Sequence, residues 1–217
     1  MRQLGRLLVA LGLGSAAAAN AQSVSLGAKA GVNRSAFTGD FGLPSNANPF
    51  GTRTGIAGGV TLAIGFHEVL AVQVEALYTE KGVVGPDLFR MNIGYVETPV
   101  LLRATLPLDG LPFRPMIMAG VAPAWEVSCG AIGRPPYIPE LPPPPPMAMD
   151  CIGWRTERRD LGGVLAGGVE VPLANVRITA EIRHTSGRTN IARGYPPFST
   201  YNGVWSVMFG TAFSIHR

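Results

Sequence analysis

Apolar and polar residues alternate with a period of two along eight stretches of this chain. Between residues 70 and 81, for example, Val72 and Val74 share one face, while Gln73 and Glu75 share the other. Because successive side chains of a β-strand point to opposite faces, the alternation predicts strands with one apolar and one polar face. The eight predicted strands are residues 24–32, 54–66, 70–81, 91–104, 114–128, 160–171, 176–185 and 203–215.

The predicted connections alternate between long and short. The long ones cover residues 34–53, 82–90, 129–156 and 186–201, and the short ones residues 67–69, 105–113 and 172–175. Outer-membrane barrels combine long extracellular loops with short periplasmic turns, and strands of about ten residues suit a tilted span. The pattern therefore predicts an all-β fold, an eight-stranded up-and-down antiparallel transmembrane β-barrel.

The polar face mixes glycine and other small residues with charges. In a soluble barrel this face would meet water, whereas in a membrane barrel it lines the lumen. A balance of five cations and five carboxylates favours the lumen, because an eight-stranded barrel is filled by its own side chains and buried charges must pair. The predicted lumen charge network is Lys29, Glu75, Lys81, Glu97, Arg103, Glu126, Glu170, Arg177, Glu181 and Arg183.

Composition narrows the possible functions. Charged residues make up only 15% of the chain, against roughly 25% in ordinary soluble domains, and the formal net charge is +4. Only Lys29 and Lys81 are lysines, and no long basic cluster occurs, so we expect no nucleic-acid partner. Phosphate-loop, zinc-protease and EF-hand motifs are absent from the sequence, and we predict neither a cofactor nor a bound metal.

The N-terminus has the features of an export signal. Arg2 and Arg6 precede the apolar run 7–13, and Ala19-Asn20-Ala21 fits the rule for cleavage after small residues. We therefore predict a cleaved signal peptide at residues 1–21 and an outer-membrane barrel domain at residues 22–217. Cys129 and Cys151 are the only cysteines, and an exported chain meets an oxidising compartment, so we predict a disulfide between them.

Tyr78-Thr79-Glu80-Lys81-Gly82 fits the motif Y-x-x-K-G, and residues 95–103, YVETPVLLR, fit the strand motif Y-x-E-x-P-x-L-L-K/R. Residues 183–191, RHTSGRTNI, fit the segment R-x-x-x-G-L-T-N-I, with Arg188 where leucine is usual. These motifs resemble those of the PorT-like outer-membrane β-barrel family, which shares the barrel architecture of the OmpA transmembrane domain. The resemblance implies an eight-stranded barrel in the cell outer membrane, and little about activity.

Aromatic residues near the strand ends are candidates for the two girdles at the membrane interfaces. Tyr95 falls on the predicted lumen face of its strand, which makes it the weakest of these candidates. The five candidates are Phe66, Tyr78, Tyr95, Trp125 and Trp205.

His184 and Ser186 could support an enzyme. Some eight-stranded outer-membrane enzymes that deacylate lipid A use such an H-x-S pair near the extracellular rim, where both residues face lipid. A Ser–His hydrolase also needs a carboxylate to orient the imidazole, and no Asp or Glu follows Glu181. We therefore expect a protein that is not an enzyme, with a lipid A-type hydrolase as the alternative.

The loop 130–150 contains five consecutive prolines, 142–146, which favour a stiff polyproline II segment that a protein partner could recognise. We expect a monomer that contacts outer-membrane lipid, has a structural or interaction role and presents its extracellular loops, with 130–150 the first place to look for a protein partner. The sequence is also compatible with a narrow channel, and with a soluble periplasmic barrel that holds a small apolar ligand.

Overall fold

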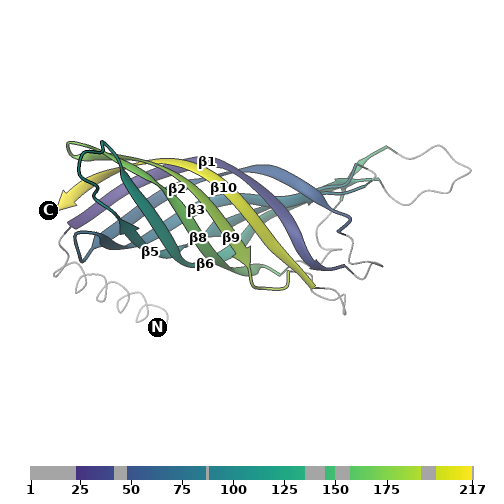
Figure 1. Ribbon diagram of the computed structural model, residues 1–217. Helices are drawn as coiled ribbons and strands as arrows, with labels where there is room; N and C mark the ends of the chain where they lie inside the picture. Colours follow the sequence, from purple (N-terminus) through teal and green to yellow (C-terminus); the bar gives the residue numbers. More distant parts are fainter. Residues whose placement is uncertain are drawn as a thin grey trace, which may run out of the picture.

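The computed structural model describes residues 23–41, 48–86, 88–134, 145–149, 157–191 and 199–216. Figure 1 shows an elongated barrel of tilted strands. Among the described residues, no helix is long and apolar enough to cross a membrane. The strands are β1 (Ser23–Asp40), β2 (Gly51–Gly65), β3 (Leu70–Val84), β4 (Arg90–Glu97), β5 (Val100–Thr105), β6 (Arg114–Gly133), β7 (Met147–Met149), β8 (Arg159–Leu173), β9 (Val176–Gly187) and β10 (Ser199–His216).

Eight antiparallel strands form the closed wall, in which sequence neighbours lie side by side and β10 pairs with β1. β4 and β5 are two parts of one wall strand, interrupted at Thr98 and Pro99, and both pair with β3 and β6. The ladder continues across the gap, because the Thr98 amide donates to the Pro123 carbonyl at 2.9 Å and the Glu75 amide donates to the Pro99 carbonyl at 3.0 Å. The predicted eight-stranded up-and-down barrel is therefore confirmed.

The two faces of the wall carry opposite chemistry. Large apolar side chains such as Leu26, Leu165 and Phe209 point outward, and Phe209 is 63% exposed. Lys29 and Glu75 are buried inside. The soluble barrel, which needed an apolar ligand-holding interior and a charged exterior, is therefore the wrong interpretation, because the inward positions hold the charges.

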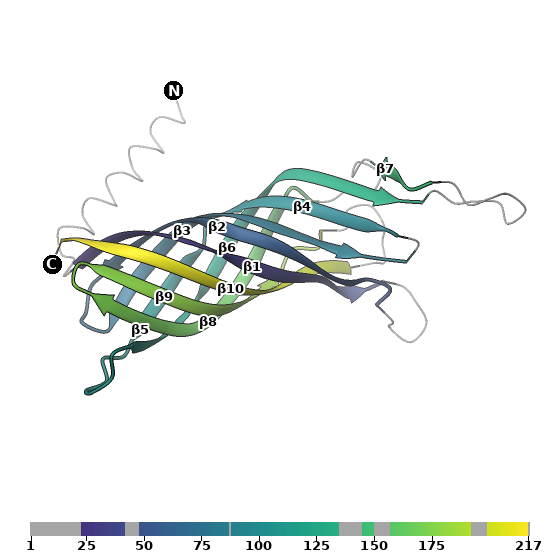
Figure 2. The same cartoon turned by 90° about the horizontal axis from the view of Figure 1, so that it is seen from above.

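Several strands run further than the apolar pattern predicted. β1 continues to Asp40 and pairs with β10 from Val24 to Asp40, so the expected loop 34–53 is in part strand. β6 continues to Gly133, where β7 pairs with it antiparallel. Figure 2 shows β7 beside the end of β6, at the end of the barrel opposite the C-terminus, and we call the pair the β6–β7 arm.

The barrel has two different ends. β1 begins and β10 ends at one of them, which also holds the connections 66–69, 106–113 and 174–175, and we call it the short-turn end. The opposite end is the long-loop end. There the lumen is filled by an apolar cluster that includes Met91, Ile93 and Ile191. The Phe50 ring packs against this cluster, with its centroid 5.9 Å from that of Phe37.

Candidate functional site

Two cations and two carboxylates form a closed ring at the centre of the lumen. Lys29 Nζ lies 2.8 Å from Glu75 Oε1 and 2.8 Å from Glu181 Oε2. Arg183 contacts the same two carboxylates, at 2.8 Å from Glu75 Oε2 and 2.9 Å from Glu181 Oε1. β1, β3 and β9 supply these side chains, and all four residues are buried. We call Lys29, Glu75, Glu181 and Arg183 the central ion-pair ring.

A second group lies closer to the long-loop end. Lys81 Nζ is 2.9 Å from Glu97 Oε1 and 3.4 Å from Asp160 Oδ2. The Asn202 amide donates to the same Asp160 oxygen at 2.8 Å. Lys81 also sits 4.7 Å from the centroid of the Tyr95 ring, a favourable cation–π geometry.

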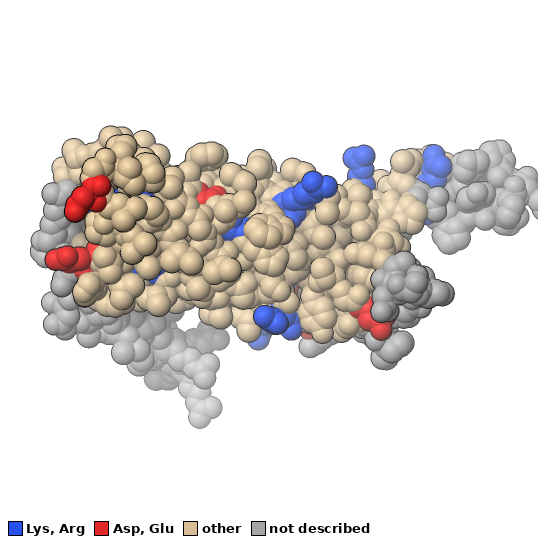
Figure 3. All heavy atoms as spheres, viewed as in Figure 1, with Lys and Arg blue, Asp and Glu red and all other residues tan. Residues whose placement is uncertain are grey.

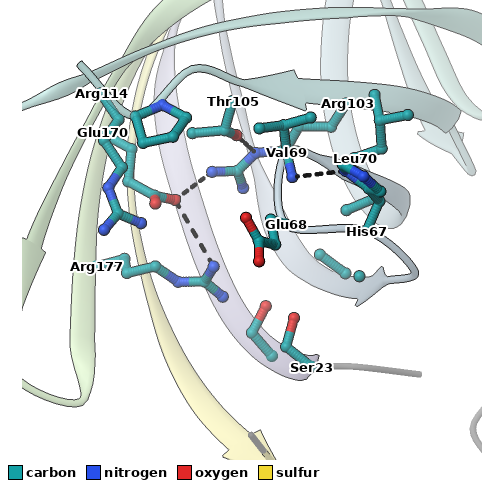
Figure 4. Close-up of a pocket in the computed structure, with 15 residues that line it drawn as sticks. Ser23, His67, Glu68, Val69, Leu70, Arg103, Thr105, Arg114, Glu170 and Arg177 are labelled. Carbon is teal, nitrogen blue, oxygen red and sulfur yellow. Dashed lines mark hydrogen bonds and ion pairs between the residues drawn. The ribbon is translucent and has the colours of Figure 1, made fainter. Parts of the chain in front are cut away.

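A third group lies at the short-turn mouth, where side chains line a cavity of about 260 Å³. Arg103 and Arg177 both reach the Glu170 carboxylate, as the dashed lines in Figure 4 show. Arg103 also donates to Gln73 Oε1 at 3.3 Å, and Gln73 in turn donates to Glu75 Oε1 at 2.6 Å. Hydrogen bonds therefore connect the mouth to the central ion-pair ring.

These three groups contain nine of the ten side chains expected in the lumen charge network. The tenth, Glu126, is half-buried near the long-loop rim, where its amide donates to the Arg158 carbonyl at 2.8 Å. Sequence reasoning missed Asp160, which is buried beside Lys81. Its even number on β8, shared with Gly162 and Glu170, was the signal that could have found it, since alternate residues of a strand share a face.

The arrangement fills the lumen. Two cavities beside the central ion-pair ring have volumes of about 10 and 20 Å³, room for about one water molecule each. An ion could pass this level only by separating Glu75 or Glu181 from its two cations. That separation is unfavourable, because it leaves buried charges without partners.

His184 and Ser186 lie on β9, both half-buried on the outer face of the wall. The imidazole of His184 packs against the ring of Trp205, with the two centroids 4.6 Å apart. Within the described part of the chain, no hydrogen bond joins His184 to Ser186 or to a carboxylate. The side chains are therefore not arranged as a Ser–His–acid triad in this structure.

Four of the five aromatic candidates for the girdles are exposed on the outer wall: Phe66, Tyr78, Trp125 and Trp205. The fifth, Tyr95, is fully buried inside the barrel, so its proposed place in a girdle is wrong. Its odd number on β4, shared with Ile93, turns the ring into the lumen.

Cys129 lies on β6, opposite Ile93 of β4. Cys151 and most of the loop 130–150 lie outside the described residues, and the disulfide stays a prediction. The signal segment 1–21 lies outside them as well. In the described ranges, no group of three or more His, Cys, Asp or Glu side chains is placed to hold a metal ion.

Comparison with known proteins agrees with this geometry. The family model described as "Outer membrane protein beta-barrel domain" matches residues 7–213. The crystal structure of Neisserial surface protein A is similar with a TM-score of 0.51 and 11% identity, covering 88% of this chain and 96% of that one. Outer membrane protein OprG from Pseudomonas aeruginosa gives a TM-score of 0.50 and 15% identity, covering 91% and 99%. No curated protein matches the chain in sequence.

Proposed function

Since the chain belongs to the outer membrane protein β-barrel domain family and lies in the outer membrane, we propose that it acts as a structural or interaction protein that presents its loops on the cell surface. The observation that carries this proposal is the filled lumen. In the described part of the barrel, the central ion-pair ring and the two groups beside it occupy the lumen, and the cavities next to the ring measure about 10 and 20 Å³. At the long-loop end, β1 and β10 stay paired as far as Asp40 and Ser199.

The orientation follows from the connections. Barrels of this type place short turns in the periplasm and long loops outside the cell. The long-loop end is therefore the extracellular end in our proposal, and residues 1–21 are the signal peptide that is removed before residues 22–217 insert as one monomeric barrel.

The β6–β7 arm lies at the long-loop end of the wall. Its strands pair through Ala131 with Met149 and Gly133 with Met147, so the arm holds both ends of the proline-rich stretch in a fixed relation. A disulfide between Cys129 and Cys151 would close the same loop and lower the conformational entropy of the unfolded chain. We propose residues 130–150 as the contact surface for a protein partner.

The proposal includes no catalysis in the lumen, because the carboxylates and lysines of the three groups are buried in ion pairs. We expect neither a cofactor nor a nucleic-acid partner. Membership of the PorT-like branch of the family is our interpretation of the motifs at 78–82, 95–103 and 183–191.

The orientation can be tested with an epitope tag in intact cells. We expect a tag inserted after Pro144 to bind antibody on unbroken cells, because this position lies in the loop carried by the β6–β7 arm. A tag inserted after Gly110, in the connection 106–113, serves as the matched control and should bind antibody only after permeabilisation. The reverse labelling pattern would mean that the long-loop end faces the periplasm, and the proposed display of loops on the cell surface would be wrong.

The filled lumen can be tested in planar bilayers. We expect the full chain, folded as judged by a heat-dependent shift on SDS gels, to give no stepwise conductance. The physical reason is that conduction would require breaking several buried ion pairs at once. Regular steps whose size changes in a Glu97→Gln variant would show a path through the lumen, and a narrow channel would then take the place of this proposal.

A further inference from the structure

Three arginines stand on the outer wall near the long-loop end: Arg34 on β1, Arg159 at the start of β8 and Arg188 directly after β9. All three are exposed. Figure 3 shows Lys and Arg side chains projecting from the half of the visible surface nearer the long loops. In the described ranges, no carboxylate lies within ion-pair distance of Arg159 or Arg188. We call these three residues the arginine patch.

Hydrogen bonds that join Leu161 to Arg188 and Thr189 hold Arg188 close to Arg159. The Arg188 amide donates to the Leu161 carbonyl at 2.7 Å, and the Leu161 amide donates to Thr189 Oγ1 at 3.1 Å. Arg159 lies two residues before Leu161 on the same face of β8. Such diagonal positions on adjacent strands are about 7–8 Å apart. Arg188 Nε lies over Gly163, and a turn of this flexible side chain toward Arg159 brings both guanidiniums within reach of one anion.

Two tryptophans define the depth of the arginine patch in the membrane. Trp125 pairs with Arg159 across β6 and β8, and Trp205 pairs with Arg34 across β10 and β1. Both tryptophans are exposed on the outer wall. Because exposed tryptophans of membrane proteins gather at the level of the lipid headgroups, the arginines beside them lie at that level too.

Two glycines flank Ser186 on the outer face of the wall, beside the arginine patch. Ser186 of β9 has Gly163 of β8 on one side and Gly203 of β10 on the other. A Cβ atom added at Gly163 would meet only Arg188 Nε, at 4.0 Å, and one added at Gly203 would have Thr38 Cγ2 as its nearest atom, at 3.7 Å. With no side chain at either glycine, the half-buried Ser186 lies in a shallow recess of the outer wall, and Arg188 Nε lies over its Gly163 side.

We propose that the arginine patch and this recess bind the phosphorylated sugar headgroup of an outer-leaflet glycolipid, of the lipid A type. Phosphate suits paired guanidiniums, because its oxygens accept parallel charge-assisted hydrogen bonds from them. The Ser186 hydroxyl can donate a further hydrogen bond, and the exposed face of Trp205 offers an apolar surface to the sugar ring. The outward position at headgroup depth selects a lipid rather than a soluble phosphate compound as the ligand.

The test uses the full-length protein in nanodiscs that contain phosphatidylcholine and diphosphoryl lipid A in both leaflets. Retained lipid A is quantified by native mass spectrometry after the protein is released. We expect the Arg159→Gln/Arg188→Gln variant to retain at least about tenfold less lipid A than the wild type, because it loses two cations at headgroup depth. Arg114→Gln removes one cation at the opposite mouth and is the control for the loss of a surface arginine, expected to bind as the wild type does.

A variant that keeps every charge distinguishes a specific lipid A site from a general attraction of anionic lipid to the arginines. Gly163→Leu fills the recess without removing an arginine, and we expect it to lower lipid A retention as well. A Cβ atom there meets no backbone, and the nearest atom is Arg188 Nε at the end of a flexible side chain, so the heat-dependent gel shift should show an intact barrel. Phosphatidylglycerol in place of lipid A should be retained equally by all variants.

Three results would overturn the proposal: equal loss in Arg114→Gln, unchanged retention in the double variant, or displacement of lipid A by inorganic phosphate. The last would mean that the arginine patch takes a free anion rather than a headgroup. Lipid in both leaflets makes the result independent of which barrel end faces outward, so the epitope-tag experiment and this one can fail separately.

Discussion

Replacing Glu75 with alanine is expected to lower the free energy of unfolding of the barrel by about 3–5 kcal/mol, the usual cost of removing one partner from a buried ion pair. Glu75 is 2% exposed and accepts hydrogen bonds from Lys29, Arg183 and Gln73. Removing its carboxylate would leave two cations in the lumen with Glu181 as their one remaining carboxylate. The gap could hold a water molecule, which solvates the cations only in part.

The measurement is urea unfolding of the protein inserted in lipid vesicles, followed by the heat-dependent gel shift. Glu68→Ala is the control, because Glu68 is exposed at the short-turn mouth and its loss should change stability little. Glu75→Gln keeps the size of the side chain and one acceptor oxygen, so its loss of stability should be smaller. Equal unfolding midpoints for Glu75→Ala and Glu68→Ala would mean that the central ion-pair ring does not stabilise the barrel.

Which side chains enter the lumen could be predicted from the sequence, because alternate residues of a strand point to opposite faces. Lys29 and Glu181 illustrate what could not be predicted. Both have lumen parity, yet they are 152 positions apart, and their 2.8 Å contact depends on strand stagger and barrel closure. Alternation along one strand carries no information on that stagger.

The ends of the strands were predicted less well, and the reason is physical. Inside the membrane, outward positions must be apolar, which produces the alternation. Beyond the membrane both faces can be polar, so Arg34 and Thr38 interrupt the pattern although β1 continues to Asp40. Asp160 was missed for a related reason. It is the second residue of β8, and the first outward apolar residue of this strand, Leu161, comes only after it.

Replacing Gly168 with leucine is expected to prevent the barrel from closing, with a loss of about 3 kcal/mol or more in stability and little folded protein. A Cβ atom at this position would lie 2.2 Å from the Ala180 carbonyl oxygen and 2.9 Å from Glu181 Cα. Both are backbone atoms of β9, so β8 and β9 would have to separate. The shift would also draw Glu181 away from Lys29 and Arg183.

Gly167→Leu is the matched control, because the neighbouring glycine faces outward. A Cβ atom there would meet only the Met116 carbonyl oxygen, at 4.0 Å, and the leucine side chain would extend into lipid, where apolar groups are favoured. We expect Gly167→Leu to assemble as the wild type does, measured as the fraction of outer-membrane protein with the heat-dependent gel shift, while Gly168→Leu loses most of this fraction. Similar behaviour of the two variants would show that the close approach of β8 and β9 at Gly168 does not limit assembly. If instead Gly168→Leu alone fails, and Glu75→Ala lowers stability as expected, then the glycines and the ion pairs act together: the small residues let the strands approach, and that approach brings Glu181 within reach of both cations.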